Sequence, residues 1–321
     1  MHPVTRITAV LALICASSTA HAQAYPSKPI RMIVPIAAGS LTDVVGRAVA
    51  QSVSQAWGQP VVAENRAGAN GTLGQDECAR SAPDGYTICM TDGNVMTLNP
   101  YAYSKLPYDP LAFVPVIHLA EIEVAMVVKG SLPVKSVREL LDYAKARPGQ
   151  VAWGSAGAGS TMHLYMEWFQ AKTGIKFNHI PYKGPAQLVQ AIAAGEVDVT
   201  YIAPSSVAPH VKTGKVKPLA VVIGKRRSPF AGDTPTLAEQ GFDLDFRNWL
   251  AMVFPPRTPM ELARRWNSEV NRVLGDNAFV KVMGSTAMIA TGGSPEDLAA
   301  ILQEKRKLGA QLAKIANLRY D

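Results

Sequence analysis

Short apolar runs of strand length alternate with segments of helical periodicity along most of the chain, and this alternation constrains the fold more than any other feature. The run 30–36 is predicted to be a strand, and Val45, Val49 and Val53 share one face of the helix predicted over 42–57. Further strands are predicted at 61–63, 86–90, 124–128, 151–153, 177–180, 197–202, 219–223 and 249–254, and further helices at 72–81, 136–146, 161–172, 186–194, 259–274, 277–283 and 295–316. This pattern predicts an α/β fold.

The first 22 residues have the three parts of a secretory signal peptide. Arg6 supplies the positive charge, the segment 9–16 is apolar, and Ala20-His21-Ala22 is an A-x-A cleavage site. The apolar segment is too short to span a bilayer, and no later run reaches the roughly 18 apolar residues that a span needs. We therefore predict an exported, periplasmic protein whose signal peptide is cleaved after Ala22.

The chain of 321 residues is long enough for two lobes, each with a hydrophobic core of its own. We expect the chain to cross between them near 121–124 and again near 245–249. These crossings divide it into a discontinuous first lobe, 23–123 with 247–321, and a continuous second lobe, 124–246. Ligands of open α/β sheets bind beyond the carboxyl ends of the strands, so a cleft between the lobes is the expected ligand site.

The formal net charge of +7 suits an anionic small ligand, and cleavage of the signal peptide lowers it only by the charge of Arg6. The basic residues are scattered along the chain instead of forming a stripe, which argues against nucleic acid as a partner.

Two cysteines, Cys78 and Cys89, remain after cleavage. Export permits a disulfide between them, but each lies in an apolar segment, and buried free thiols are the favoured interpretation. Neither belongs to a C-x-x-C motif, so no metal site is expected, and the sequence predicts no cofactor.

The first candidate binding segment is the loop 37–43 (AAGSLTD), between a predicted strand and a predicted helix. Backbone N–H groups at such a junction bind anions. The competing interpretation is a capping box, in which Ser40 and Asp43 satisfy those N–H groups within the protein. The spacing of the residues leaves both interpretations open.

The second candidate segment is 154–163 (GSAGAGSTMH), with Ser160 as the expected helix cap. Its glycines and alanines allow a ligand to approach the backbone closely, and a tight turn alone does not need this composition. It lacks the spacing of a dinucleotide-binding loop and the lysine of a P-loop. Binding is favoured here, and two such loops facing each other would hold a carboxylate through neutral donors.

The alternative function is a secreted hydrolase that uses His163 with Ser155 or Ser160. The chain has no G-x-S-x-G motif, which argues against this alternative. His163 and Glu167 lie four residues apart but lack the second histidine of a zinc-protease motif. We therefore expect a binding protein without catalytic residues.

An ordered series of short motifs runs through the mature chain. They are YPSKPI at 25–30, ENRAGA at 64–69, APDGYT at 82–87, LPYDP at 106–110, SAGAGS at 155–160 followed by His163-Leu164, PYKG at 181–184 and PTLAEQG at 235–241. Through this series the chain resembles the Bug-type receptors of tripartite tricarboxylate transporters.

The resemblance implies a type II periplasmic-binding-protein fold, in which two α/β lobes close around a carboxylate held between the loops at Gly39 and Ser155. It also implies a membrane transporter as partner, and uptake or sensing as the function, for which we expect a monomeric receptor. The residues expected to contact the ligand are Ile36, Ala38, Gly39, Ser40, Thr42, Asp43, Ser155, Ala156, Gly157, Gly159, Ser160, His163, Tyr182, Pro204 and Ser205.

Three departures from the family pattern concern the ligand. Ile36 replaces the usual aromatic residue, and Ser40 replaces the second glycine of a Gly-Gly pair. The segment 203–205 (APS) has no acid, whereas family members that bind amino acids tend to have one there. We therefore expect a mono-, di- or tricarboxylate without an ammonium group, including aromatic acids such as terephthalate or nicotinate.

Overall fold

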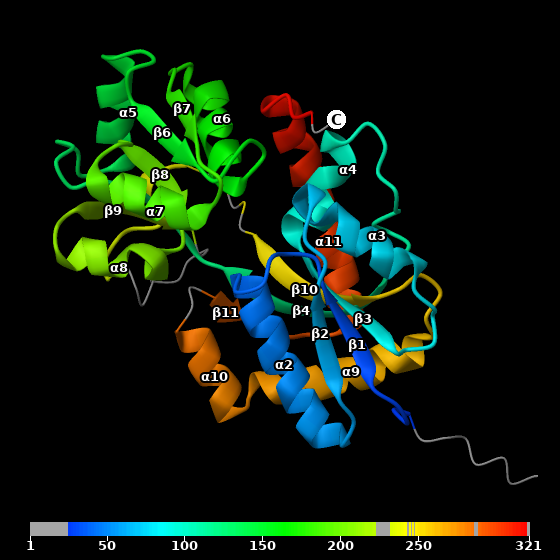
Figure 1. Cartoon of the computed structure of the whole chain (residues 1–321). Helices are drawn as coiled ribbons and strands as arrows, with labels where there is room; N and C mark the ends of the chain where they lie inside the picture. The colour runs from blue at the N-terminus through cyan, green and yellow to red at the C-terminus, as the bar shows by residue number, and fades with distance from the viewer. Residues whose placement is uncertain are drawn as a thin grey trace, which may run out of the picture.

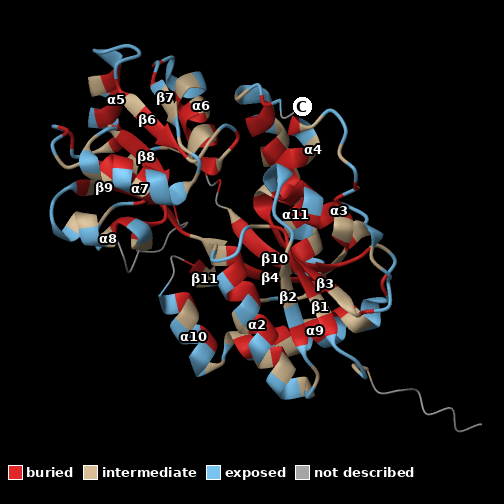
Figure 2. Cartoon of the chain, viewed as in Figure 1, coloured by how far each residue is buried: buried red, intermediate tan, exposed pale blue. Residues whose placement is uncertain are grey.

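The computed structural model describes residues 25–222, 232–242, 244, 246, 248–285 and 288–319. The predicted signal peptide lies outside these residues. The described chain forms two lobes, each built on one sheet with helices on its faces (Figure 1). Burial is concentrated on the sheets and on the helix faces that cover them (Figure 2). Within this part of the chain, no helix combines the length and the apolar content that a bilayer span requires.

The sheet of the first lobe has six strands in the order β11-β4-β10-β3-β1-β2. β1 is parallel to both of its neighbours, and β10 is antiparallel to β3 and β4. The strands are Ile30–Val34 (β1), Val61–Asn65 (β2), Thr87–Asp92 (β3), Val114–Ile122 (β4), Trp249–Phe254 (β10) and Met288–Ala290 (β11). Because β1 and β3 are adjacent and parallel, the segments that follow them emerge at the same edge of the sheet.

The helices of the first lobe cover this sheet. The predicted apolar face of α2 is confirmed, because Val45, Val49 and Val53 are fully buried. The elements are Leu41–Trp57 (α2), Ala69–Gly71 (η1, a 3-10 turn), Thr72–Arg80 (α3), Asn94–Leu98 (η2, a π-helical turn), Asn99–Ala102 (α4), Met260–Leu274 (α9), Asn277–Gly284 (α10) and Pro295–Ile315 (α11).

The sheet of the second lobe has five strands in the order β7-β6-β8-β5-β9. Its elements are Val124–Lys129 (β5), Val137–Lys145 (α5), Ala152–Ser155 (β6), Thr161–Thr173 (α6), Asn178–Pro181 (β7), Pro185–Ala194 (α7), Val199–Ile202 (β8), Pro204–Lys212 (α8), Val216–Val222 (β9) and Ala238–Gln240 (η3). The sequence pattern does not predict α8, because Pro209 lies inside it and proline normally interrupts a helix.

The C-terminal helix α11 packs against both lobes. It contacts β4 and η2 of the first lobe. Leu312 and Ala313, near its end, belong to the same buried cluster as Trp153 and Tyr165 of the second lobe. Figure 1 shows the red end of this helix beside α6.

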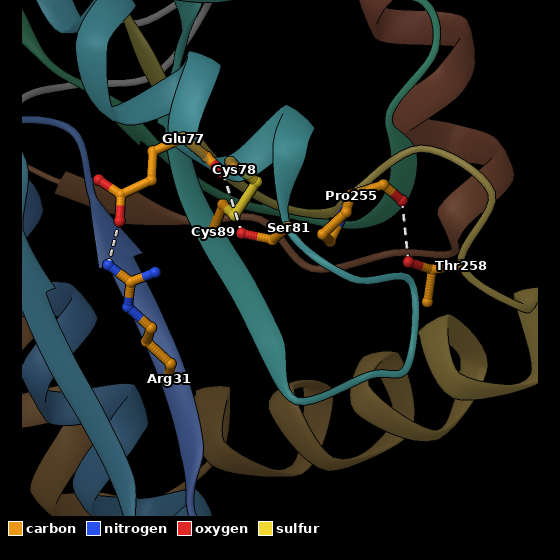
Figure 3. Close-up of a disulfide and its surroundings, with 7 residues drawn as sticks. All are labelled: Arg31, Glu77, Cys78, Ser81, Cys89, Pro255 and Thr258. Carbon is orange, nitrogen blue, oxygen red and sulfur yellow. Dashed lines mark hydrogen bonds and ion pairs between the residues drawn. A yellow bond between two sulfur atoms is a disulfide. The ribbon is translucent and has the colours of Figure 1, made fainter.

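Cys78 on α3 and Cys89 on β3 form a disulfide (Figure 3), with their Cα atoms 6.2 Å apart. Both residues are fully buried, as their apolar settings indicate. The favoured interpretation as free thiols is nevertheless wrong. Disulfide formation depends on the distance between α3 and β3, and the spacing of the cysteines along the chain does not reveal that distance. Nearby, Arg31 of β1 forms an ion pair with Glu77 of α3 (Figure 3).

Candidate functional site

A cavity of about 180 Å³ lies between the two lobes. Both lobes contribute to its wall, which consists of Ile36, Asn70, Asp92, Asn94 and Asn99 from the first lobe and Ala156, Ala158, Gly159 and Ser160 from the second. None of these described lining residues is a lysine, an arginine or a histidine. An anion bound here would therefore be held by neutral hydrogen-bond donors.

The second-lobe wall is the loop between β6 and α6. Gly157 and Gly159 have φ angles of 111° and 75°, a left-handed conformation that strains residues with a side chain. Ser160 caps α6, because its Oγ accepts the N–H of His163 at 3.4 Å. The N–H groups of Ala156 and Ala158 have no acceptor within the described part of the chain. These two N–H groups and the N-terminal end of α6 can serve as donors to an anion.

Ser155 supports this loop from behind and does not line the cavity. It is fully buried, and its Oγ lies 2.7 Å from Nε2 of His179. The same oxygen accepts the N–H of Gly157 at 3.1 Å. Burial, together with the nearby His163, lowers the pKa of His179, which favours its neutral form as a partner of the Ser155 hydroxyl.

His163 also holds the loop in place. Its Nδ1 accepts the N–H of Gly159 at 3.1 Å, and its Nε2 lies 3.5 Å from a carboxylate oxygen of Glu167. The contact with His163 lowers the pKa of Glu167. The imidazole ring of His163 stacks on that of His179 with ring centroids 4.4 Å apart.

Within the described residues, the structure does not join the ring of His163 to the hydroxyl of Ser155 or Ser160, as the hydrolase alternative requires. Ser155 contacts His179 instead of His163, and Ser160 contacts His163 only through the backbone N–H. The hydroxyl of Ser155 is also inaccessible to a substrate, because the residue is fully buried.

In the loop 37–43 of the first lobe, Ser40 and Asp43 act as helix caps. Ser40 Oγ accepts the N–H of Asp43 at 3.2 Å, and Asp43 Oδ2 accepts the N–H of Gly39 at 2.9 Å. Burial opposes the charge of Asp43, but hydrogen bonds from Arg47, Gly39 and Asn65 hold its pKa below the usual value. Of the two open interpretations, the local cap agrees with these contacts. The Asp43 carboxylate accepts the N–H of Gly39, whereas in a capping box it would accept the N–H of Ser40.

The predicted ligand residues separate into two groups. Ile36, Ala156, Gly159 and Ser160 line the cavity. The remainder lie outside the described cavity wall, and they are Ala38, Gly39, Ser40, Thr42, Asp43, Ser155, Gly157, His163, Tyr182, Pro204 and Ser205. The hydroxyl of Tyr182, for example, donates to Glu196 at 3.4 Å, and Pro204 is buried at the start of α8.

Four polar residues of the cavity wall were not predicted: Asn70, Asp92, Asn94 and Asn99. Asn70 lies in a left-handed turn with a φ angle of 51°. Asn99 supports this turn, because its Nδ2 donates to the backbone oxygen of Asn70 at 3.0 Å. The available signal was Asp92-Gly93-Asn94, a polar segment directly after the buried strand β3.

Asp92 lies at the end of β3 and is 6% exposed. Its Oδ1 accepts the N–H of Val95 at 3.1 Å. Burial raises the pKa of Asp92 to about 6, although backbone N–H groups of Val95 and Asn94 stabilise the charged form. The described residues include no group of three histidines, cysteines or carboxylates arranged to hold a metal ion.

The comparison with known proteins identifies the family. The model described as "Tripartite tricarboxylate transporter family receptor" matches residues 45–318. The chain is also 34% identical over 297 residues to Protein BugT of Bordetella pertussis, covering 89% of this chain and 91% of that protein. The chain belongs to the tripartite tricarboxylate transporter receptor family. The Bug-type resemblance is thereby confirmed.

Two solved receptor structures have the same fold. Rpa4515 of R. palustris with adipate is 32% identical, has a TM-score of 0.80, and matches over 92% of this chain and 99% of that chain. MatC of Rhodopseudomonas palustris with bound malate is 26% identical, has a TM-score of 0.76, and matches over 90% of this chain and 99% of that chain. The predicted fold, two α/β lobes of the type II periplasmic-binding-protein class, is confirmed.

Proposed function

We propose that this receptor binds a small carboxylate in the cavity between its lobes and delivers it to a membrane transporter of the tripartite tricarboxylate type. The observation that carries the proposal is the polarity of the second-lobe wall. Ala156 and Ala158 offer backbone N–H groups without a protein acceptor, beside the N-terminal end of α6. A carboxylate accepts hydrogen bonds from such groups at a modest desolvation cost, because no buried cation has to be paired.

The ligands of two similar structures support the chemical class. Rpa4515 holds adipate and MatC holds malate, so receptors with this fold accommodate carboxylates of different length. Ile36 contributes an aliphatic surface to the present cavity. Such a surface suits the carbon skeleton of a small organic acid.

The cellular setting follows from the family and from the N-terminal segment. The predicted signal peptide would export the chain to the periplasm and be removed after Ala22. The family description names a tripartite transporter, which supports membrane subunits as the recipient of the bound acid. Membrane vesicles that contain the transporter should take up the labelled acid only when the receptor is added, and receptor-independent uptake would contradict the partnership.

A ligand screen with the mature chain tests the function. Thermal or urea unfolding is measured with a panel of aliphatic and aromatic carboxylates, using the amide of each acid as the control. An acid at about 100 times its Kd should add about 2.7 kcal/mol to the free energy of unfolding. A panel without any stabilising acid, combined with turnover of a chromogenic ester, would show that the chain is an enzyme instead.

A further inference from the structure

The first-lobe wall of the cavity includes two residues, Asp92 and Asn99, with side-chain oxygens that can accept hydrogen bonds. Asn99 is 1% exposed, and its Nδ2 is committed to Asn70 O at 3.0 Å and Thr72 Oγ1 at 3.3 Å. Its Oδ1 is buried and has no partner within the described part of the chain. The two acceptors of Nδ2 fix the amide orientation, so the side-chain atom of this lining residue without a partner is the oxygen.

Asp92 adds a carboxylate to the same wall without a cation beside it. The contacts that stabilise its charge are backbone N–H groups, and the cavity wall as described has no basic side chain. A buried carboxylate normally has a charged or hydrogen-bonding partner for each oxygen. A ligand in the cavity is in a position to supply the partner that the protein lacks.

The two walls of the cavity therefore offer different groups, although the side-chain amides of Asn70 and Asn94 also belong to the first-lobe wall. The second lobe offers the N–H groups of Ala156 and Ala158, and the first lobe offers oxygens of Asp92 and Asn99. We propose that the ligand carries, in addition to its carboxylate, a hydroxyl or ammonium group that donates hydrogen bonds to Asp92 and Asn99. This inference rests on the proposed function and specifies the ligand class of the same site.

An ammonium group on the ligand was not expected from the sequence. The lack of an acid at 203–205 indicates a carboxylate without an ammonium group. Pro204 and Ser205, however, lie outside the described cavity wall, whereas Asp92 lines it. If the ligand had a second carboxylate at this end, two negative charges would meet at Asp92, and neither that carboxylate nor the oxygen of Asn99 could donate a hydrogen bond to the other. Such an arrangement disfavours an unsubstituted dicarboxylate at pH 7.5.

The test varies only the end group of the ligand. Binding to the full mature chain is measured by calorimetry at pH 7.5 for acids of three to six carbons whose far end is methyl, hydroxyl, ammonium or carboxylate. For the best chain length, the hydroxyl or ammonium acid should bind about 10-fold or more tightly than the methyl and carboxylate acids, as expected for a hydrogen bond to a charged acceptor.

Two variants identify the residue responsible. Asp92→Asn should abolish most of this preference and, for the ammonium acid, weaken binding by about 10-fold or more. Asp109→Asn removes the same charge at an exposed position outside the described cavity wall and should leave the preference unchanged.

Equal affinity for all end groups, or a preference that survives Asp92→Asn, would overturn this inference while leaving a carboxylate receptor. Failure of every acid to bind would instead contradict the proposed function.

Discussion

Asp92 lowers the stability of the free protein at neutral pH. Its carboxyl group is buried, and burial raises its pKa from 3.8 to about 6. The folded state therefore favours the neutral form more than the unfolded state does. Below pH about 4 the carboxyl group is neutral in both states, and Asp92 has no cost to stability. As the pH rises from about 4 through about 6, the free energy of unfolding falls, because the unfolded state loses this proton more readily than the folded state. Binding residues often carry such a cost, because a group prepared for a ligand is not satisfied without it.

Asp92→Asn should remove this pH dependence. The shift of about 2 pKa units corresponds to about 3 kcal/mol, so the variant should gain up to about 3 kcal/mol over the wild type between pH 4 and pH 7.5. Urea unfolding of both proteins across this range gives the difference directly, since their other titrating groups are shared. Parallel stability curves would show that Asp92 is not buried as described.

Ser155 and Ser160 should respond differently to replacement by alanine. Ser155→Ala leaves His179 Nε2 and the N–H of Gly157 without their partner, and should lower the free energy of unfolding by about 1–3 kcal/mol. Ser160→Ala removes the cap of α6 at a cost of about 1 kcal/mol and alters the cavity wall directly. Calorimetry should show the larger loss of carboxylate affinity for Ser160→Ala. The opposite order would place the hydroxyl of Ser155 in the site.

At the scale of elements, strand–loop–helix junctions shape the site. The β6–α6 loop and the segments after β1 and β3 contribute to the cavity, because the strands end at edges that face it. The disulfide ties α3 to β3, and thus supports the strand that carries Asp92. The disulfide is therefore expected to stabilise the first-lobe wall from outside the described cavity wall.

Replacement of both Cys78 and Cys89 by alanine should destabilise the first lobe. The cysteines are 11 residues apart, and a loop of this size corresponds to about 3 kcal/mol in the chain-entropy model. Reductant should lower the melting temperature of the wild type and have no effect on the double variant. Similar sensitivity of both proteins to reductant would mean that the disulfide does not form.

At the scale of the whole molecule, the cavity depends on how the lobes are placed. Its wall comes from both lobes, which the chain connects at Glu123 and again before Trp249. The end of α11 provides a further contact, because Leu312 and Ala313 pack with the second lobe. A ligand that contacts both walls favours the arrangement in which the lobes are close together.

Ligand binding should therefore make the molecule more compact. The closed arrangement excludes water from the cavity, which strengthens the hydrogen bonds to the carboxylate. Small-angle scattering of the mature chain should show a smaller radius of gyration with saturating ligand than without it. An identical radius in both states would indicate a preformed rigid site, and the transporter would then have to recognise the bound receptor by another feature.

Local patterns in the sequence predicted most of the elements and one wall of the site. Apolar periodicity located α2 to within a few residues, because a helix buries side chains at a fixed spacing. The helices predicted over 161–172 and 295–316 also agree with α6 and α11 to within a few residues. The composition of 154–160 indicated a close approach to the backbone. Ala156, Gly159 and Ser160 of this segment do line the cavity. Such features depend only on neighbouring residues.

The tertiary structure alone decided the opposite wall and the disulfide. Asn70 follows β2, whereas Asp92 and Asn99 belong to the segment that ends β3 and begins α4, and the parallel order β3-β1-β2 brings the ends of these strands to one edge of the sheet. Strand order reflects packing between distant segments, and no local pattern specifies it. The same holds for Cys78 and Cys89, whose pairing depends on how α3 packs against β3. The sequence by itself thus determined the receptor architecture and its glycine-rich loop, whereas the packing of the first lobe decided which polar side chains line the cavity.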